Sequence, residues 1–442
     1  GKMPMARTRF TLLIAIAAML ALPLQARAAQ IYVKPSGGTA LTLTVNLTDT
    51  VGSVKQKVES QASVPAAAQE LSFSGSTLDD AKTLSFYSIA HQSTLTLEFS
   101  WKADLVLGHS TFTVNTETGA AANTFYQNYV DRMGSFSFGP PIPLPGPRGI
   151  FVDTTGAAWV ADSGRHRVLR FSPPFTNGMN ADLVLGQKDF TSFQTSVQSS
   201  GTLNSPAAVA VDSGSRVWVA DSSNHRILRF SPPFTNGMGA DLVLGQADFT
   251  STEFNRGGGY TSVQANGFSA PHGVSIDPQG RVWVADTHTR RAVRYSPPFS
   301  NGMNPDLVLG QPSLTAGSPW SCTSGGANAT NMGCPYGIAV DYSGAVWAAD
   351  IYYKRVVRFS PPLSNGQAAD LVLGQANFTT VQSATTENVL ARPGSVSVDK
   401  GGNAWVADLG ANRGLLFLAP LSSGAKAGLV LGQRAFDQAL RG

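Results

Sequence analysis

Cysteine, histidine and charged residues are all scarce in this sequence of 442 residues. It contains 2 cysteines, 6 histidines and only 14% charged residues, against 42% hydrophobic residues. A chain this apolar and this weakly charged is not an intrinsically disordered one. Its length exceeds what a single hydrophobic core usually supports, so we expect at least two folded units.

The two cysteines, Cys322 and Cys334, lie in one insertion that is rich in glycine, serine and asparagine. In an oxidising compartment we expect them to form a disulfide bond, which would close this loop and stabilise the fold by on the order of 3 kcal/mol. A zinc site would need further cysteine or histidine partners beside them. The sequence therefore predicts a disulfide here and no metal.

A hydrophobic run long enough to span a bilayer is also missing. The longest run, Phe10 to Leu22, follows Lys2, Arg7 and Arg9 and is shorter than the ~20 residues that a membrane helix needs. The small residues of Ala26-Arg27-Ala28 come after it. This pattern predicts a cleavable signal peptide over residues 1–28, with cleavage after Ala28, and a secreted or periplasmic protein of bacterial type without a stable membrane anchor.

Cleavage of the signal peptide would remove the net positive charge of the chain. The whole chain carries 32 basic and 28 acidic residues, and four basic residues but no acidic ones lie before the cleavage point. The mature chain is then formally neutral, which gives no support for a nucleic-acid partner. We expect a monomer.

Motifs of the common catalytic sites are absent too. No Gly-x-Ser-x-Gly, phosphate loop, dinucleotide fingerprint or His-Glu-x-x-His occurs. Glycine and proline are abundant instead, with 45 and 26 residues. Many turns of this kind favour an all-β architecture of short strands for much of the chain.

Residues 29–100 alternate in the strand period at 30–34 and 41–45, on either side of a Pro-Ser-Gly-Gly turn. Thr50 can cap a helix with Val51, Val54 and Val58 on one face, and further strands are expected at 70–73 and 94–99. The segments QIYVK, LTLTV, DTVGSVKQKV, VPAAAQELSFSG, LDDAKTLSFYSI and STLTLEF resemble ubiquitin in order and spacing. This resemblance implies an α+β β-grasp domain.

Two departures from that family bear on function. The chain runs from Phe99 directly into the next domain, without the terminal Gly-Gly tail through which ubiquitin-like modifiers are conjugated. The positions that match the family's apolar recognition patch are small, polar or charged: Ser36, Ser72, Thr96 and Glu98. We therefore expect neither conjugation nor binding by ordinary ubiquitin receptors.

Residues 101–442 consist of internal repeats. The block Trp-x-Ala-Asp recurs at Trp159, Trp218, Trp283, Trp347 and Trp405, and Asp-Leu-Val-Leu-Gly begins at Asp104, Asp182, Asp241, Asp306 and Asp370, with a degraded copy at Gly428. Each unit reads as four short strands, in repeats near 145–187, 204–246, 269–311, 333–375 and 391–433. Such sheets cannot bury both faces alone, so copies must stack and close into a ring.

These blocks resemble NHL repeats, which implies a β-propeller. Five blades are clear, and the surplus strand at Asp104 allows the two chain ends to pair. Residues 109–145 lack the Trp-x-Ala-Asp block, so five and six blades both remain open. The fold class is thus multi-domain, with an α+β domain followed by an all-β propeller.

An aspartate and an arginine recur five residues apart in every repeat, where they can face each other across a hairpin and fix its turn. Because the pair recurs in all five blades, we interpret it as structural, and we interpret His166 and His225 in the same hairpins likewise. The pairs are Asp162 and Arg167, Asp221 and Arg226, Asp286 and Arg291, Asp350 and Arg355, and Asp408 and Arg413.

Enzymes that share this fold, such as amidating lyases, carry histidines and carboxylates at the mouth of the central channel. The matching positions, each after a proline, are Arg148, Ala207, His272, Tyr336 and Gly394. A zinc site of the lyase kind needs about three histidines there, and only His272 is present. Arg148, His272 and Tyr336 are instead candidate ligand-binding residues, with no catalytic residue assigned.

A ring of carboxylates, Asp153, Asp212, Asp277, Asp341 and Asp399, would bind calcium only if they pointed inward, and capping of the following turns is the alternative. The sequence therefore supports no cofactor. We expect an extracytoplasmic, non-catalytic binding or scaffold protein whose propeller engages a protein, peptide or glycan. The alternative is a propeller-type lyase or hydrolase with a metal at the channel mouth.

Overall fold

The computed structural model describes residues 28–35, 40–62, 66, 69–99, 107, 146–195, 197–260, 262–317, 322, 325–433 and 435–439. The chain divides into two compact units, residues 1–101 and 102–442. The expected signal peptide up to residue 27, Ser36, Asp104 and the stretch 109–145 lie outside the described residues. In the described part of the chain, no helix is long and apolar enough to cross a membrane.

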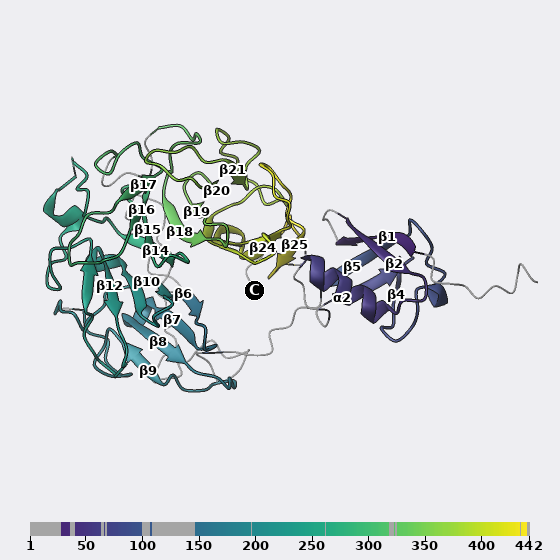
Figure 1. Cartoon of the computed structure of the whole chain (residues 1–442), viewed down its shortest axis with the longest axis horizontal. Coiled ribbons are helices and arrows are strands. Elements are labelled where there is room, and N and C mark those ends of the chain that lie inside the picture. Colours follow the sequence, from purple (N-terminus) through teal and green to yellow (C-terminus); the bar gives the residue numbers. More distant parts are fainter. Residues whose placement is uncertain are drawn as a thin grey trace, which may run out of the picture. The chain divides into compact units, whose positions relative to one another are not determined.

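The first unit is a five-stranded sheet with one α-helix (Figure 1). Its strands follow the order β2-β1-β5-β3-β4, and β1 pairs in parallel with β5. The elements are β1 (Ala28–Pro35), β2 (Leu41–Asn46), α2 (Val51–Ala62), β3 (Gln69–Phe73), β4 (Ser76–Thr77), the 3-10 helix η2 (Ser85–Tyr87) and β5 (Thr94–Phe99). This is the β-grasp arrangement that the strand and helix pattern predicts.

The helix α2 forms where the sequence predicts it. The hydroxyl of Thr50 accepts a hydrogen bond from the backbone N–H of Ser53 at 3.2 Å, which caps its first turn. Val51, Val54 and Val58 are fully buried and pack the helix on the sheet. On the opposite face of the sheet Thr96 and Glu98 are exposed, and Ser72 pairs with Thr96. The described positions of the ubiquitin patch therefore form a polar surface.

The second unit contains five four-stranded antiparallel sheets, each formed by four consecutive strands. The 3-10 helices η3 (Ser163–Arg165), η4 (Ser222–Asn224), η5 (Phe254–Gly257) and η6 (Leu409–Ala411) lie between strands. The sheets are β6 (Pro147–Val152), β7 (Ala158–Asp162), β8 (Arg167–Phe171) and β9 (Leu183–Leu185); β10 (Pro206–Val211), β11 (Val217–Asp221), β12 (Arg226–Phe230) and β13 (Leu242–Leu244); β14 (Pro271–Ile276), β15 (Val282–Asp286), β16 (Arg291–Tyr295) and β17 (Leu307–Leu309); β18 (Pro335–Val340), β19 (Val346–Asp350), β20 (Arg355–Phe359) and β21 (Leu371–Leu373); β22 (Pro393–Val398), β23 (Ala404–Asp408), β24 (Arg413–Phe417) and β25 (Leu429–Leu431).

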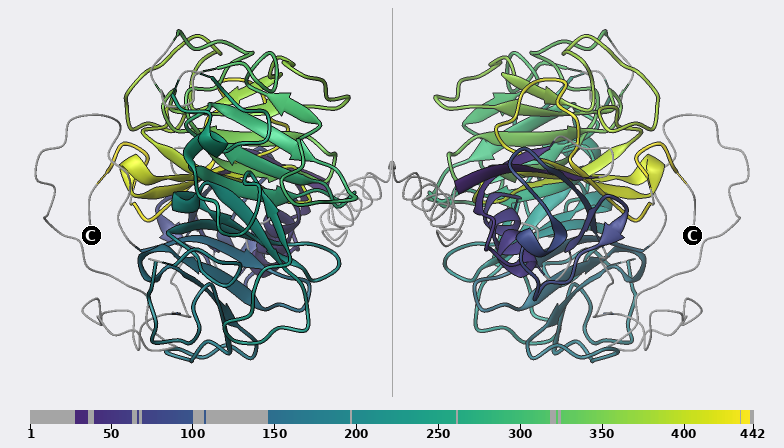
Figure 2. Two further views of the ribbon diagram at one scale, coloured as in Figure 1. Left: turned by 90° about the vertical axis from the view of Figure 1, so that its left-hand side faces the viewer. Right: turned by 90° about the vertical axis from the view of Figure 1, so that its right-hand side faces the viewer.

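Successive sheets pack face to face around a common centre, as Figures 1 and 2 show. The first strand of each sheet is innermost and contacts the first strand of the next. Each interface has its own apolar core; between the first two sheets, Trp159, Leu185, Val219 and Phe230 are all buried. The repeats therefore bury their apolar faces against one another, as expected for a β-propeller.

The first sheet differs from those inside the stack. Ile150 and Val152 on β6 are 66% and 60% exposed, whereas Val209, at the position equivalent to Ile150, is 4% exposed. On the same side of the first sheet, Leu107 packs against a cluster containing Ala158 and Val160. Leu107 belongs to the surplus Asp-Leu-Val-Leu-Gly block of the sequence, and it packs on the first sheet much as Leu185 packs on the second.

Candidate functional site

The site begins with a backbone irregularity that recurs at the start of every inner strand. Pairing between the first and second strands is regular except at one point, just after the leading proline, where the register shifts. A bulge of this kind redirects the side chain it contains. The redirected positions are Arg148, Ala207, His272, Tyr336 and Gly394, the channel-mouth positions selected from the sequence.

Glycines allow neighbouring inner strands to approach closely just beyond this bulge. A Cβ atom placed on Gly273 would lie 2.7 Å from the backbone oxygen of Tyr336, and one on Gly337 would lie 2.6 Å from Cα of Ser395. A Cβ atom placed on Gly149 would likewise lie 2.8 Å from Cα of Ala208. The inner strands are therefore in van der Waals contact here, and the groups at the mouth are held on a tightly packed backbone.

The recurring aspartate and arginine lie behind the mouth and are in contact in all five blades. Their side chains are fully buried, and the Arg Nε to Asp Oδ2 distances are 2.8, 2.7, 3.0, 3.2 and 3.0 Å along the chain. Each arginine also donates to backbone oxygens of the loop that leads away from its sheet. The pair thus joins the hairpin to the surrounding loops.

The aspartates of these pairs also fix the loops that lead into the mouth. Asp286 Oδ1 accepts the backbone N–H of Ser269 at 2.7 Å, and Asp350 Oδ1 accepts that of Cys334 at 2.9 Å. Asp408 Oδ1 accepts the N–H of Arg392 at 2.7 Å. The hairpin with the recurring Asp–Arg pair therefore positions the segments that carry His272, Tyr336 and Arg392.

His272 on β14 has a defined tautomer. Its Nδ1 lies 2.8 Å from the backbone oxygen of Ala270 and 3.0 Å from Oγ1 of Thr287. Thr287 donates its own hydroxyl proton to the backbone oxygen of Pro335 at 2.7 Å. Because a carbonyl oxygen can only accept, Nδ1 of His272 carries the proton, and Nε2 of the neutral ring presents a lone pair.

His272 is neutral at physiological pH. Burial lowers its pKa to about 3, and the nearby charges of Arg148 and His288 add to this effect. Its ring stacks on Tyr336 from the next blade, with centroids 4.2 Å apart and planes inclined by 26°. Two of the three candidate residues are thus in direct contact.

Tyr336 on β18 is supported from behind by the disulfide bond between Cys322 and Cys334. The two cysteines and Ile351 form a small buried cluster, and the rings of Tyr336 and Tyr352 pack against it. The hydroxyl oxygen of Tyr336 is buried and has no hydrogen-bond partner among the described residues. Burial raises the pKa of Tyr336, while Arg148 and Arg392 oppose the rise, so both guanidinium groups lie near this ring.

Arg392, the residue before the last inner strand, was not among the candidates taken from the sequence. Burial lowers the pKa of Arg392, and Tyr336 opposes this effect. In the fifth repeat glycine occupies the bulge, at Gly394, and the cationic side chain stands two residues earlier. A search confined to the residue after each proline misses it for that reason.

His166 and His225 have structural contacts outside the mouth. Nδ1 of His166 accepts the backbone N–H of Ser205, and Nδ1 of His225 accepts that of Ala270, each at 3.0 Å. Each histidine therefore bonds its own hairpin to the next blade. Burial lowers the pKa of both, to about 4 for His225.

The five carboxylates considered for calcium are engaged in turns at the other end of the inner strands. Asp153 accepts the backbone N–H of Thr155 at 2.9 Å and the indole N–H of Trp159 at 2.8 Å. Asp212, Asp277 and Asp341 accept the indole of their own Trp in the same way. Asp399 accepts from Asn403 instead. The turn-capping alternative therefore describes their contacts.

Metal ligation is not favoured by the residues that the structure describes. They contain no group of three or more histidine, cysteine or carboxylate side chains that could hold a metal ion. The charge effects on His272 come from Arg148, His288 and His225, and these histidines do not form such a group with it. These residues do not fit the three-histidine zinc site of the lyase kind.

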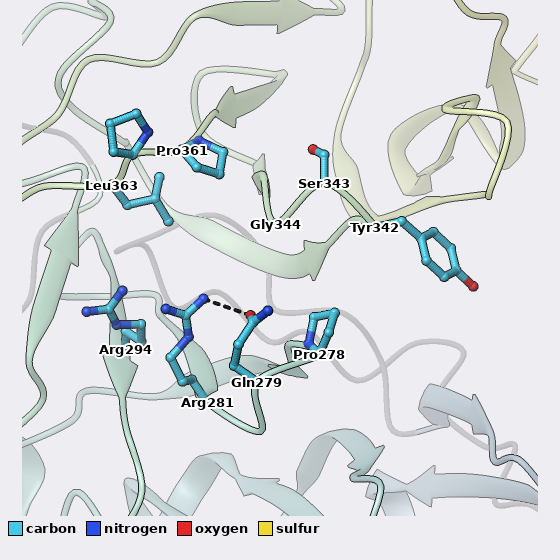
Figure 3. Close-up of a pocket in the computed structure, with 10 residues that line it drawn as sticks. Pro278, Gln279, Arg281, Arg294, Tyr342, Ser343, Gly344, Pro361 and Leu363 are labelled. Atoms are coloured by element: carbon cyan, nitrogen blue, oxygen red, sulfur yellow. Dashed lines mark hydrogen bonds between the residues drawn. The ribbon is translucent and has the colours of Figure 1, made fainter.

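A second concave region lies between neighbouring blades at the turn end (Figure 3). One pocket, of about 530 Å³, is lined by Arg281, Arg294, Tyr342, Pro361 and Leu363 among others. Arg281 bonds to Gln279, and the ring of Tyr342 points away from the two arginines. Arg281 and Arg294 are paired with Asp277 and Asp306, so this pocket has no excess of either charge from these groups.

The last two blades have leucine where two earlier blades have phenylalanine, at the position that packs on the tryptophan of the preceding blade. In earlier blades Phe234 and Phe299 pack edge to face on the Trp of the preceding blade, with centroids 5.3 and 5.0 Å apart. Leu363 and Leu421 stand at the equivalent positions of the last two blades and line the two pockets found there. Because leucine is smaller than phenylalanine, it leaves these two pockets open at the interfaces between blades.

Comparison with known families identifies both units. The ubiquitin family model matches residues 31–100, and the NHL repeat model matches residues 144–171, 203–230 and 268–291. The chain joins a ubiquitin-family domain to an NHL-repeat β-propeller. The ubiquitin match covers the β-grasp sheet and helix, and the NHL matches cover inner strands and Asp–Arg hairpins of the first three blades.

One curated relative is an enzyme. Peptidyl-glycine alpha-amidating monooxygenase of Mus musculus is 38% identical over 99 residues, which is 22% of this chain and 9% of the relative. The chain therefore spans less than a tenth of that protein by this match. The NHL propeller is typical of protein-interaction scaffolds, and the partial similarity points to an enzyme as a second possibility.

Proposed function

We propose that this protein is an extracytoplasmic, non-catalytic binding protein whose NHL propeller engages a protein, peptide or glycan ligand at the channel mouth. The observation that carries the proposal is the convergence of Arg148, His272 and Tyr336 from three different blades. They occupy the redirected position of otherwise equivalent strands, and no two of them are the same residue type. Variation at one position of a repeated scaffold is characteristic of a recognition surface.

The electrostatics of these groups support binding rather than catalysis. His272 is held neutral with its Nδ1 proton bonded to the backbone, and the nearby acidic side chains Asp286 and Asp350 are buried in ion pairs. A general acid and base of matched pKa are therefore not brought together among the described residues. Arginine and tyrosine are the side chains that most often contribute binding energy at interfaces.

Binding to peptide and glycan arrays tests the proposal. The mature protein should retain a defined set of ligands, and the variant Arg148→Gln/Tyr336→Phe should lose them by tenfold or more. Arg281→Gln is the matched control, because Arg281 lies at the turn end of a blade. The proposal fails if the mouth variant binds as well as the wild type, or if neither array returns a ligand.

The partial similarity to the amidating monooxygenase favours an enzyme as the second candidate. A peptide ending in α-hydroxyglycine would then lose glyoxylate by cleavage of its N–Cα bond and leave the peptide amide, a redox-neutral change that mass spectrometry detects. Conversion that His272→Asn abolishes would support this candidate. Unchanged peptide after prolonged incubation with added zinc or copper, or conversion that His272→Asn leaves intact, would count against it.

A further inference from the structure

The residue before the leading proline of the inner strand is held by a histidine in the second and third blades. This residue, Ser205 or Ala270, lies in the left-handed region, with φ of 51° and 53°. Its backbone N–H donates at 3.0 Å to Nδ1 of a histidine in the hairpin of the preceding blade, His166 or His225. A non-glycine residue at positive φ is strained, so it persists only where other contacts hold it. We call this the histidine-bound conformation.

The same residue is held differently in the fourth and fifth blades. There it is Cys334 or Arg392, and it does not lie in the left-handed region. Its backbone N–H donates to the hairpin aspartate of its own blade, Asp350 at 2.9 Å or Asp408 at 2.7 Å. Its backbone oxygen accepts a hairpin N–H at 3.0 Å, whereas in the second and third blades that bond goes to the oxygen of the preceding residue. We call this the aspartate-bound conformation.

One hairpin position of the preceding blade distinguishes the two conformations. His166 and His225 precede the histidine-bound segments, and Arg290 and Lys354 precede the aspartate-bound ones. The hairpin backbone is the same at all four positions, with φ of 55°, 54°, 58° and 54°. A neutral imidazole nitrogen can accept an N–H, whereas the side chains of arginine and lysine carry only donors. The histidine-bound conformation therefore occurs where the hairpin offers an acceptor.

Protonation would remove that acceptor from His225. Both ring nitrogens of an imidazolium are donors, so Nδ1 could no longer accept the N–H of Ala270. Asp286 is the group that can accept this N–H instead, because its Oδ1 already accepts the neighbouring N–H of Ser269 at 2.7 Å. In the fourth blade the equivalent aspartate accepts both N–H groups of the segment. The aspartate-bound conformation is thus an alternative that this fold already contains.

The titratable groups around His225 are two histidines and two ion pairs. His288 and His272 of the next blade interact electrostatically with it. The ion pairs belong to its own hairpin and to the next one: Asp221 with Arg226, and Asp286 with Arg291. From the loop after β13, the ring of Phe254 contacts the imidazole edge to face at 5.7 Å, and Glu253 beside it is exposed. The two carboxylates of the hairpins are therefore already balanced by arginine.

These surroundings set the direction of the pH dependence. Burial, with a contribution from the charge of His288, lowers the pKa of His225 to about 4, and burial lowers the pKa of His166. Release of the ring from the hydrogen bond and from burial would return its pKa towards the ordinary value of about 6.5. The conformation with the lower pKa is favoured at high pH and loses ground as the pH falls. Acid therefore favours the aspartate-bound conformation.

We propose that His166 and His225 are pH-dependent switches between blades: each neutral ring holds the next segment in the histidine-bound conformation, and its protonation shifts that segment to the aspartate-bound conformation. The segment after His225 leads into His272, whose Nδ1 donates to the backbone oxygen of Ala270. The switch therefore moves a residue of the channel mouth. A change of ligand affinity in acid would rest on the proposed function, whereas the switch itself requires no ligand.

Crystal structures of the full chain carrying His225→Lys or His225→Gln at pH 7.5 test the switch directly. Lysine offers no acceptor, so Ala270 should leave the left-handed region and donate its N–H to Asp286. Glutamine keeps an acceptor oxygen and does not titrate, so Ala270 should stay as it is. The segments before Pro335 and Pro393 are internal controls and should not change. Should His225→Lys fail to fold, His166→Lys makes the same test on Ser205.

The amide signal of Ala270 in the full chain labelled with 15N-alanine tests the pH dependence in solution. As the pH falls from 7.5 to 4.5, the signal of the wild type should move towards its position in His225→Lys. The ratio of the two conformations should change by up to tenfold per pH unit below the ordinary histidine pKa. In His225→Gln the signal should not move over this range.

Either of two results would overturn the inference: a left-handed Ala270 in the lysine variant, or an Ala270 signal that moves equally with pH in the wild type and in His225→Gln. Neither measurement uses a ligand, so a failure of the peptide and glycan arrays leaves this test intact. Conversely, an unchanged segment in the lysine variant removes the switch and leaves the proposed binding function standing.

Discussion

The hairpins behind the channel mouth have the same aspartate and arginine in every blade, whereas the channel mouth has a different residue in each blade. Every hairpin carries the same buried aspartate and arginine, with Nε to Oδ2 distances between 2.7 and 3.2 Å. The bulged position a few residues away carries arginine, alanine, histidine, tyrosine and glycine in turn. In a repeat protein the invariant contacts therefore report on assembly, and the position that varies on the same backbone reports on recognition.

The hairpins and the channel mouth also differ in what they contribute to stability. Each hairpin ion pair is fully buried, and the aspartate Asp286 also holds the backbone that leads into the inner strand of its own blade. The mouth instead leaves the buried hydroxyl of Tyr336 without a partner in the described structure, which costs stability. Substitutions should therefore separate stability from binding. Tryptophan fluorescence follows mainly the propeller, because Trp101 is the first tryptophan of the chain and the other six lie in residues 102–442.

The largest effect should come from breaking a hairpin pair. Arg291→Met leaves the carboxylate of Asp286 buried and unpaired, which should lower the free energy of unfolding by about 3–5 kcal/mol. Urea unfolding measures the change. Arg294→Met is the control, because its partner Asp306 is 38% exposed and exposed pairs contribute less than ~1 kcal/mol. Equal losses in the two variants would contradict the structural reading of the hairpin.

Removal of the disulfide should have the next largest effect. Cys322→Ser/Cys334→Ser opens a loop of 12-residue separation, and we expect a loss of on the order of 3 kcal/mol in thermal unfolding. Because the disulfide packs against Tyr336, affinity at the mouth should fall as well. A variant that loses stability but keeps full affinity would show that the disulfide does not position this ring.

Acidification should destabilise the propeller between pH 6.5 and 5. The folded-state pKa values of His225 and His272, about 4 and about 3, lie below the unfolded value of about 6.5, so the unfolded chain takes up protons that the folded chain does not. Stability is therefore fully present above pH 6.5 and falls by about 1.4 kcal/mol per pH unit for each histidine as the pH drops. Urea midpoints at a series of pH values measure this slope.

His225→Asn should make that slope shallower, because asparagine occupies the equivalent hairpin position at Asn412 and does not titrate. If the free energy of unfolding falls equally steeply with pH in the wild type and the variant, His225 does not cause the acid sensitivity.

A methyl group at the floor of the mouth should have a smaller effect on stability. Gly273→Ala places a Cβ 2.7 Å from the backbone oxygen of Tyr336 and should cost about 1–3 kcal/mol while displacing the stacked ring. Gly326→Ala is the control, since no heavy atom lies within 4 Å of its added Cβ. Thermal unfolding should separate the two, and similar midpoints would indicate that the inner strands adjust freely.

The smallest effect on stability should come from the mouth itself. Tyr336→Phe removes a hydroxyl without a described partner, so the unfolding midpoint should stay the same or rise slightly. Affinity for an array ligand bound at the channel mouth should nevertheless fall about fivefold to tenfold, because one hydrogen bond is lost. A marked loss of stability would mean that the hydroxyl has a structural partner, and the contrast between the two regions would weaken.

Much of the fold follows from the sequence because its repeats and periodicities are strong. The Trp-x-Ala-Asp and Leu-Val-Leu blocks predict β7 and β9 and their counterparts, and Thr50 with its three valines predicts α2. The Asp–Arg contacts could also be predicted, since a five-residue separation across a tight hairpin places both side chains on one face.

The geometry of the mouth could not be predicted in the same way. The stack of His272 on Tyr336 depends on a contact between two blades, and the disulfide packs against that ring together with Ile351, which follows another strand. Arg392 precedes its proline rather than following it, so the repeat alignment does not place it with Arg148. Long-range packing decides these features, and local sequence carries no signal for them.

Hydrogen–deuterium exchange with and without a saturating ligand identified on the peptide or glycan arrays tests the central claim most directly. The account predicts slower exchange at the starts of the inner strands, in residues 146–150, 271–275, 335–338 and 391–394, and unchanged exchange in the turns that contain Asp277 and Asp341. Protection confined to those turns, or spread evenly over all five blades, would contradict a ligand site at the channel mouth.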